Sequence, residues 1–336
     1  MDSTLIAVVG PTAVGKSDLA LDLAEALGGP AQVEVLNTDA YQLYRGMDIG
    51  TAKLAPHERR GFVHHQLDVL DVTQDASVAR YQSAARTDAD RVLAAGRRLV
   101  AVGGSGLYVR ALLDQMDFPG TDPDVRAAWE ERGERQGARV LHDELARRDP
   151  QAAAAIEPRN LRRIVRALEV VELTGRPYSA SLPRQEYVRP AVQIGIDADR
   201  DELDARVEAR VERMWESGLV AEVEALAGPD LDGLGRTAAR AVGYAQVLAM
   251  LRGELTEAEA KAGTVVATRR LARKQMGWFG RDPRVHWLHA GSPDLLERAQ
   301  RIVTEADAGR LPAQAPLGGG PLRRPLGQAS ARPDDR

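Results

Sequence analysis

The stretch Gly10-Pro11-Thr12-Ala13-Val14-Gly15-Lys16-Ser17 matches the pattern G-x-x-x-x-G-K-[S/T]. It follows Leu5–Val9, a β-branched run that predicts a buried strand, and it precedes Asp18–Leu27, which has helical spacing. A strand, a glycine-rich loop and a helix in this order form a P-loop, whose amides and helix N-terminus hold phosphate. We expect all eight residues to bind phosphate, with Lys16 supplying charge and Ser17 a hydroxyl ligand for Mg²⁺.

The pattern around the P-loop predicts an α/β fold. Val33–Asn37 and Leu99–Val102 are short apolar runs typical of strands, and Tyr81–Ala95 between them has helical composition. Alternating strands and helices predict a P-loop NTPase-like parallel sheet flanked by helices. This pattern covers residues 1–114, the first part of the core.

Strand-like runs disappear after this point. Asp124–Gln136 and Asn160–Leu173 have helical spacing, so residues 115–190 are interpreted as an α-helical insertion domain. Val192–Ile196 again reads as a strand, and residues 191–308 form the mostly helical second part of the core, with a last short strand at Val285–Leu288. Residues 309–336, rich in Pro, Gly, Ala and Arg, predict a disordered tail.

Composition narrows the class of protein. Apolar residues make up 44% and charged residues 28% of the 336, as in ordinary globular proteins. With no cysteine, the chain can have neither disulfides nor thiolate catalysis. The sequence has no signal-peptide core and no apolar run of about 20 residues, so we expect a cytoplasmic protein without membrane partners, and a monomer.

The P-loop alone leaves the phosphate compound open. ATP or GTP chemistry is its usual use, but Leu99–Val102 ends in Gly103-Gly104-Ser105 rather than in an acidic metal ligand. Asp39, at the end of the second strand, is the remaining acid where α/β ligands bind, although it could equally cap a helix. A small-molecule or nucleotide kinase is therefore one alternative, and an RNA-binding nucleotide switch is another.

Seven stretches in order resemble the tRNA dimethylallyltransferases, also called tRNA isopentenyltransferases. The first two are the P-loop and Asp39–Lys53, which begins Asp39-Ala40-Tyr41-Gln42. The others are His64-His65 with Leu67-Asp68, Gly103-Gly104-Ser105-Gly106-Leu107-Tyr108, Arg163–Glu169, Val242-Gly243-Tyr244, and Arg273-Lys274-Gln275 with Trp278-Phe279. They span roughly residues 5–290 and disfavour both alternatives.

The resemblance implies transfer of a dimethylallyl group from dimethylallyl diphosphate to N6 of adenosine 37 in tRNA, beside the anticodon, with Mg²⁺ as cofactor. Asp39 would be the base, Ser105 would lie near the reacting centre, and Arg210 would clamp the diphosphate. The positions that match tRNA-contacting residues are Asp39, Ala40, Tyr41, Gln42, Ser105, Arg126, Arg162, Arg163, Ile164, Val165 and Arg166.

Some positions depart from the family pattern. Ala40 replaces the usual Ser, Ser105 replaces Thr but keeps the hydroxyl, and Gly277 and Gly280 replace a Thr or Ser and an Arg. None of these changes removes a group that the chemistry requires. The net charge is −4, so binding of an RNA would rest on local basic clusters rather than on the overall charge.

Overall fold

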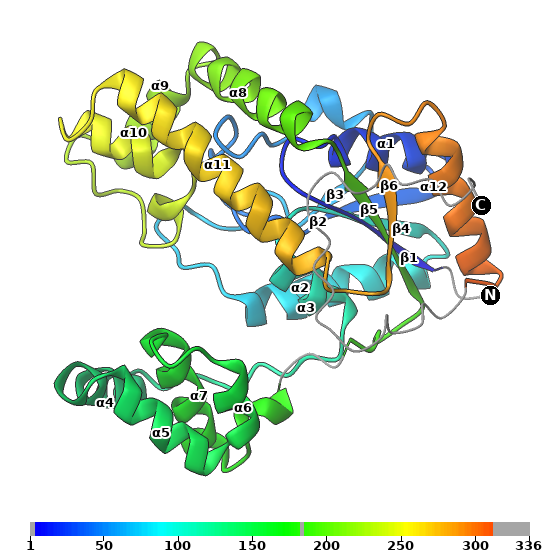
Figure 1. Ribbon diagram of the computed structural model, residues 1–336. Helices are drawn as coiled ribbons and strands as arrows, with labels where there is room; N and C mark the ends of the chain where they lie inside the picture. The colour runs from blue at the N-terminus through cyan, green and yellow to red at the C-terminus, as the bar shows by residue number, and fades with distance from the viewer. Residues whose placement is uncertain (1–3, 182–184, 312–336) are drawn as a thin grey trace. The chain divides into compact units, whose positions relative to one another are not determined.

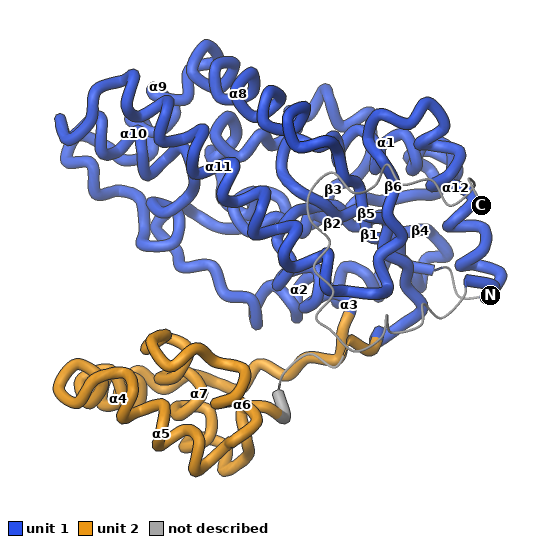
Figure 2. Tube along the Cα trace, viewed as in Figure 1, with its two compact units in different colours: residues 1–113, 187–336 blue, residues 114–186 orange. Residues whose placement is uncertain are grey.

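The computed structural model of the chain describes residues 4–181 and 185–311. The chain divides into two compact units, which Figure 2 distinguishes by colour. Unit 1 combines the residues up to Leu113 with those from Tyr187 onward, and unit 2 is Asp114–Glu186. Because the chain leaves and re-enters unit 1, unit 2 is an insertion in it.

A parallel sheet of six strands forms the centre of unit 1 (Figure 1). Its order is β3-β2-β4-β1-β5-β6, and every neighbouring pair is parallel. The strands are β1 (Leu5–Val9), β2 (Val33–Asn37), β3 (His64–His65), β4 (Arg98–Val102), β5 (Ala191–Asp197) and β6 (Val285–His289). β1 and β2 are buried along their whole length, as expected for a parallel sheet covered on both faces.

Helices cover both faces of this sheet. α1 (Lys16–Ala26) packs with α12 (Leu295–Asp307), whose Ala299 and Val303 join the same apolar core. α2 (Val78–Ala94) packs with α3 (Gly106–Leu113) and against β4. Figure 1 shows these two pairs on opposite sides of the strands. A short 3₁₀ helix, η1 (Pro56–Arg59), precedes β3.

A helical lobe completes unit 1. It consists of α8 (Arg200–Glu216), α9 (Leu219–Ala227), η3 (Ala238–Arg240), α10 (Tyr244–Leu251) and α11 (Glu257–Phe279). Its apolar core includes Val211, Trp215, Leu219, Val223 and Tyr244. α11 has 23 residues and contacts α10 at one end and α3 nearer the sheet, so this one helix links the lobe to the α/β core (Figure 1).

The helices and strands that the structure describes in unit 2 are all helices. It contains α4 (Pro123–Gln136), α5 (Ala138–Arg148), α6 (Pro150–Ala155), α7 (Leu161–Thr174) and η2 (Tyr178–Ser181). Apolar side chains of the four α-helices, among them Trp129, Leu141, Ala152 and Ile164, form a separate core. Asp122 and Asn160 cap α4 and α7, which explains where both helices begin.

The sequence analysis located most of these elements. The predicted α/β class and parallel sheet are confirmed, whereas it proposed no element at β3 or α3 and no helix at α12. β3 is only two residues long, too short to show a periodicity. From residue 312 onward, the predicted tail lies outside the described residues.

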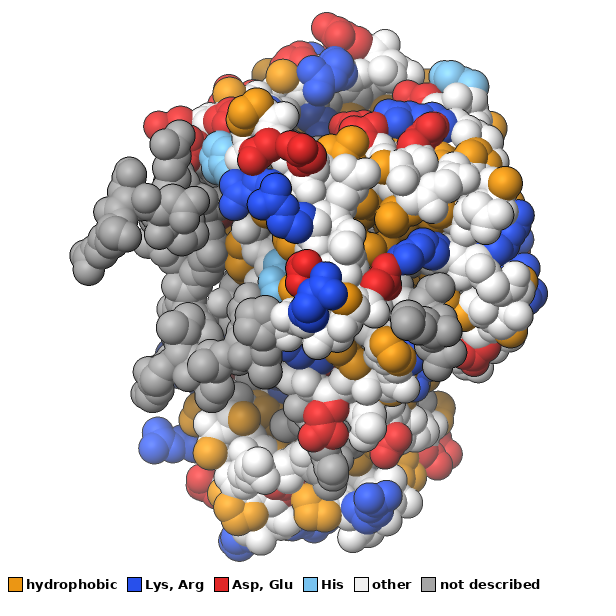
Figure 3. Space-filling model, turned by 90° about the vertical axis from the view of Figure 1, so that its right-hand side faces the viewer, with side chains coloured by type: hydrophobic (Ala, Val, Ile, Leu, Met, Phe, Trp, Pro, Cys, Tyr) orange, Lys and Arg blue, Asp and Glu red, His pale blue; other side chains and the backbone are white. Residues whose placement is uncertain are grey.

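The described helices are all too short or too polar to cross a bilayer. In the view of Figure 3, Lys and Arg side chains are interspersed with Asp and Glu. Some basic residues are likewise paired: Arg269, for example, forms ion pairs with Asp204 and Glu208.

Candidate active site

The P-loop lies between β1 and α1 and is shaped by two glycines. Gly10 has φ +145°, and a Cβ there would lie 2.4 Å from the Ile196 carbonyl oxygen of β5, so a side chain cannot be accommodated. Gly15 has φ +96° and precedes the first residue of α1. The loop therefore turns sharply enough to direct its amides and the N-terminus of α1 toward one place.

Lys16, the first residue of α1, reaches back over the loop, and its Nζ donates to the Pro11 carbonyl at 2.7 Å. Burial lowers the pKa of Lys16 to about 8; the Arg210 charge acts in the same direction, and the Asp39 charge opposes it. The ammonium is thus poorly solvated and repelled by a second cation. A bound polyanion would relieve both effects.

Asp39 follows β2 in a tight turn. Its Oδ1 accepts the Tyr41 amide at 3.0 Å, and its own amide donates to Asn37 Oδ1 at 2.9 Å. Ser105, the last residue of the β4–α3 connection, accepts the Ala40 amide with its Oγ at 3.1 Å. Residues at the ends of two strands thereby fix the backbone on both sides of Asp39. The second carboxylate oxygen of Asp39, Oδ2, has no hydrogen-bond partner among the described residues.

One cavity in unit 1 brings together the predicted cations and the predicted base. Lys16 and Asp39 line it from the strand ends, and Arg210 lines it from α8. Arg210 donates to Thr12 Oγ1 at 3.4 Å. The rest of the wall is mostly apolar or uncharged: Thr12, Tyr41, Gly50, Thr51, Val211, Met214, Ala241, Val242, Thr264, Thr268, Leu271 and Gln275. Ser105 does not line this cavity. Its hydroxyl instead accepts the Ala40 amide and supports the turn that follows Asp39.

A second hollow lies against the P-loop and is more basic. It shares Lys16 and Arg210 with the first cavity and adds Ser17, Arg206 and Arg213. The sequence analysis did not single out Arg206 or Arg213. Their spacing from Arg210 in the sequence could have identified them, since helix positions three and four residues apart share one face.

The segment from Tyr41 to Lys53 forms one cavity wall and is held by two charged side chains, the buried Lys53 and the half-buried Glu222. Lys53 Nζ donates to the Tyr44 carbonyl at 2.7 Å and to Asp48 and Asp68, each at 2.6 Å. Glu222 of α9 accepts the consecutive amides of residues 48, 49 and 50 at 2.7–3.2 Å. It also accepts the Tyr244 hydroxyl. Sequence reasoning missed Glu222, because the three amides that it accepts lie more than 170 residues away in the chain.

The residues that match tRNA contacts fall in both units. In unit 1, Tyr41 lines the cavity, and Gln42 Nε2 donates to the Thr51 carbonyl at 3.1 Å. In unit 2, Arg162 and Arg163 are exposed, but the side chains of Ile164 and Val165 are buried in the core and cannot reach a ligand.

Arg126 and Arg166 have structural partners within unit 2. Both bond to Oε2 of Glu169, at 2.8 and 2.9 Å, and Glu169 is fully buried. The two guanidinium groups keep the pKa of Glu169 below its usual range despite the burial, which acts in the opposite direction. Arg166 also donates to the Pro119 carbonyl at 2.6 Å. Two of the four predicted arginines therefore stabilise a buried carboxylate.

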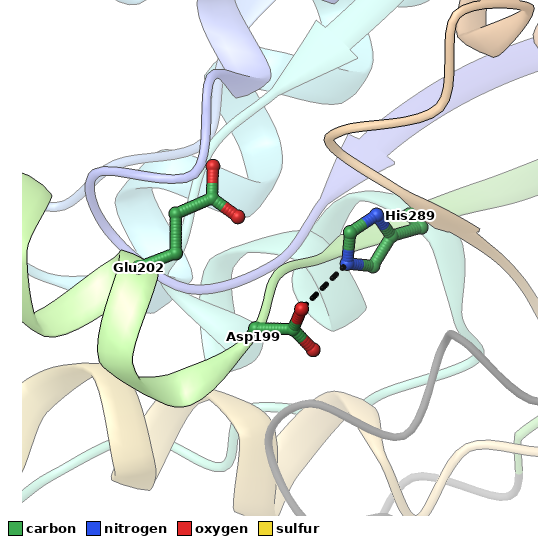
Figure 4. A group of neighbouring side chains, drawn as sticks. All are labelled: Asp199, Glu202 and His289. Atoms are coloured by element: carbon green, nitrogen blue, oxygen red, sulfur yellow. Dashed lines mark ion pairs between the residues drawn. The ribbon is translucent and has the colours of Figure 1, made fainter.

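The one further group of possible metal ligands among the described residues is Asp199, Glu202 and His289 (Figure 4). His289 Nδ1 accepts the Gly291 amide at 3.1 Å, so the proton of the neutral ring is on Nε2. Nε2 faces Asp199 at 3.8 Å, and Glu202 pairs with Arg206. A metal-binding histidine offers a lone pair and donates from its other nitrogen, the reverse of this arrangement, so the group does not fit a metal site.

Comparisons with known proteins agree on one family. The family model described as IPP transferase matches residues 42–282. A tRNA dimethylallyltransferase of Thermobifida fusca (strain YX) is 61% identical over 90% of this chain and 95% of its own length. The full-length tRNA isopentenylpyrophosphate transferase of Bacillus halodurans is 36% identical, with a TM-score of 0.65 over 92% of this chain and 96% of its own.

A second solved structure, that of a eukaryotic dimethylallyltransferase acting on tRNA, resembles the chain in fold. The TM-score is 0.78, with 22% identity over 93% of this chain and 81% of its own.

Glu222→Ala should lower the free energy of unfolding by about 1–3 kcal/mol, because it removes the shared acceptor of the amides of residues 48–50. Urea denaturation measures this change. Glu224→Ala is the matched control, since Glu224 is exposed on the same helix. Equal effects of the two substitutions would show that Glu222 does not hold the segment.

Affinity for inorganic diphosphate should fall as the pH rises through about 8. An anion favours charged Lys16 and so raises its pKa, and the complex then holds a proton that the free protein loses above about 8. The expected slope is at most about tenfold per pH unit for one proton. Calorimetry on wild type and Lys16→Met separates this effect from the titration of diphosphate itself. The idea fails if both proteins show the same pH dependence.

Proposed function

The chain belongs to the tRNA dimethylallyltransferase (IPP transferase) family, and we propose how its cavity carries out prenyl transfer to tRNA. In this reaction, N6 of adenosine 37 bonds to C1 of dimethylallyl diphosphate, the C1–O bond breaks, the N6 proton leaves and diphosphate is released. The observation that carries the proposal is that Asp39, Lys16 and Arg210 line one cavity. One cavity would thereby provide both a base for the tRNA amine and two cations for the diphosphate of the donor.

Asp39 is proposed as the acceptor of the N6 proton. The amine is a weak nucleophile because its lone pair is delocalised into the adenine ring, so proton removal assists attack as the C–N bond forms. The Tyr41 amide engages only Oδ1 of Asp39. Oδ2 is therefore available to accept N6–H, and Ser105 supports the turn through the Ala40 amide.

Lys16, Arg210 and the P-loop amides are proposed to stabilise the leaving diphosphate. Negative charge grows on its bridging oxygen as the C1–O bond stretches, and preorganised donors act most strongly on such developing charge. Ser17 lies at the start of α1 beside Lys16, and its hydroxyl is a hard oxygen ligand of the kind that Mg²⁺ takes together with phosphates. When bound there, Mg²⁺ would neutralise part of the diphosphate charge.

The apolar part of the cavity suits the dimethylallyl chain. Val211, Met214, Ala241, Val242 and Leu271 lie in the same wall as Arg210 and Asp39. An apolar wall excludes water from the allylic carbon, which favours transfer to the amine over hydrolysis. This is the reason to prefer an allylic diphosphate over a nucleotide as donor, and it disfavours the kinase alternative.

The tRNA is proposed to contact both units. A stacked adenine cannot enter a cavity, so adenosine 37 would be extruded, at a cost of a few kcal/mol or less in a single-stranded loop. Tyr41 and Gln42 would then meet the base and its neighbours. Exposed Arg162 and Arg163 of unit 2 would bind phosphates of the anticodon stem-loop, while Arg126 and Arg166 act through the fold. We take one chain as the working unit, in the cytoplasm.

Asp39→Asn should lower kcat for prenyl transfer by about 10²–10⁴-fold, because the amide cannot accept the N6 proton. The asparagine oxygen can still accept the Tyr41 amide, so the turn should persist. The measurement is incorporation of radiolabelled dimethylallyl diphosphate into an anticodon stem-loop RNA with Mg²⁺. Full activity of the variant would exclude Asp39 as the base. Absence of label with wild type, alongside ATP consumption, would favour the kinase.

Arg162→Ala/Arg163→Ala should weaken RNA affinity and lower the slope of log K against log salt by about 0.7–0.9 for each phosphate that the variant no longer neutralises. Fluorescence titration at several salt concentrations measures both. Arg135→Ala/Arg139→Ala is the matched control, because these arginines are also exposed on unit 2. A slope that changes equally in both variants would show that Arg162 and Arg163 form no specific contact.

A further inference from the structure

One P-loop amide donates to the side chain of a residue that is distant in the sequence. Gln275 of α11 is only 6% exposed, and its Oε1 accepts the Thr12 amide at 2.7 Å. The group facing Thr12 N–H must be the amide oxygen, since a nitrogen there would oppose two donors. The two residues are 263 positions apart, so only the tertiary fold makes this contact.

The next three amides of the loop, unlike that of Thr12, are not engaged by the protein. Among the described residues, the amides of Ala13, Val14 and Gly15 have no hydrogen-bond partner. In a P-loop these groups are the donors that hold phosphate oxygens. The anion cradle of this chain therefore begins after Thr12, whose amide is occupied by Gln275, a residue that lines the same cavity as Asp39.

Gln275 fits closely into this position. A Cβ on Gly104 would lie 2.2 Å from Gln275 Nε2, so the glycine provides the room for the amide. Thr12 is fixed from its other side as well, because its hydroxyl accepts from Arg210 at 3.4 Å. Thr12, at the boundary of the cradle, is thus contacted from two sides, by Gln275 at its amide and by Arg210 at its hydroxyl.

We propose that Gln275 sets the depth at which the diphosphate binds, by occupying the amide that would otherwise bind a further phosphate oxygen. It is a positioning residue, and it also limits the length of polyphosphate that the loop accepts. This inference rests on the proposed function. Consecutive Cα atoms are about 3.8 Å apart, so a shift of the diphosphate by one amide would displace the allylic carbon from Asp39 by several ångströms. A misplacement of only about 1 Å can cost about 10²-fold in rate.

The first test is Gln275→Ala, which frees the Thr12 amide. We expect kcat to fall about 10²-fold while KM for dimethylallyl diphosphate stays unchanged or decreases. Gln275→Glu keeps an acceptor for the Thr12 amide but adds a negative charge beside the diphosphate. It should retain more of kcat than Gln275→Ala while KM rises. A rise in KM with unchanged kcat in Gln275→Ala would overturn the proposal.

The second test uses inorganic diphosphate and triphosphate as ligands in calorimetry, so it does not depend on transfer activity. Wild type should prefer diphosphate, and Gln275→Ala should bind triphosphate about tenfold more tightly than wild type does, as one more charge-assisted hydrogen bond predicts. An unchanged ratio of the two affinities would refute the length limit, even if the proposed function holds.

Controls separate this contact from general damage. Gln74→Ala is the matched substitution, because Gln74 Oε1 also accepts a backbone amide, that of Asp71 at 2.9 Å, but lies outside the cavity. It should leave kcat, KM and the affinity ratio unchanged. If Gln275→Ala is not folded by circular dichroism, Gln275→Glu decides the question through its kcat and KM. If wild type transfers no label, the proposed function fails, while the two phosphate affinities still test the depth of the cradle.

Discussion

The parallel pairing of β1 with β4 and β5 is the constraint on which the site depends. Because neighbouring parallel strands end at the same edge of a sheet, the P-loop after β1, Asp39 after β2 and Ser105 after β4 converge there. The packing is tight enough at Gly10 that its Cα lies against the backbone of β5. A strand shifted by one residue would turn its side chains to the other face and separate these groups.

The sheet edge supplies only half of the site, and the helical lobe supplies the other half. Arg210 of α8 and Gln275 of α11 both contact Thr12, one at its hydroxyl and one at its amide. Glu222 of α9 anchors the segment that follows Asp39. A P-loop common to many phosphate-binding proteins thus acquires its particular shape from helices that are distant in the sequence.

The cavity combines mutually repelling cations with an apolar wall. Lys16 is buried beside Arg210, which lowers its pKa, and Arg213 adds further positive charge near Arg210. A bound diphosphate would offset this repulsion, so part of its binding free energy comes from the relief of unfavourable charge interactions within the protein.

The sequence by itself determined the P-loop, the parallel α/β core, the helical insertion and the family, because these depend on local spacing and on the order of motifs. It also identified Lys16, Asp39 and Arg210, which the structure brings to one cavity. The tertiary structure decided what each group contacts. Ser105 supports a backbone turn, Arg126 and Arg166 hold a buried Glu169, and Ile164 and Val165 belong to a core. Glu222 and Gln275 bind backbone amides that are distant in the chain. The sequence pattern cannot predict such contacts, because every residue except proline has a backbone amide.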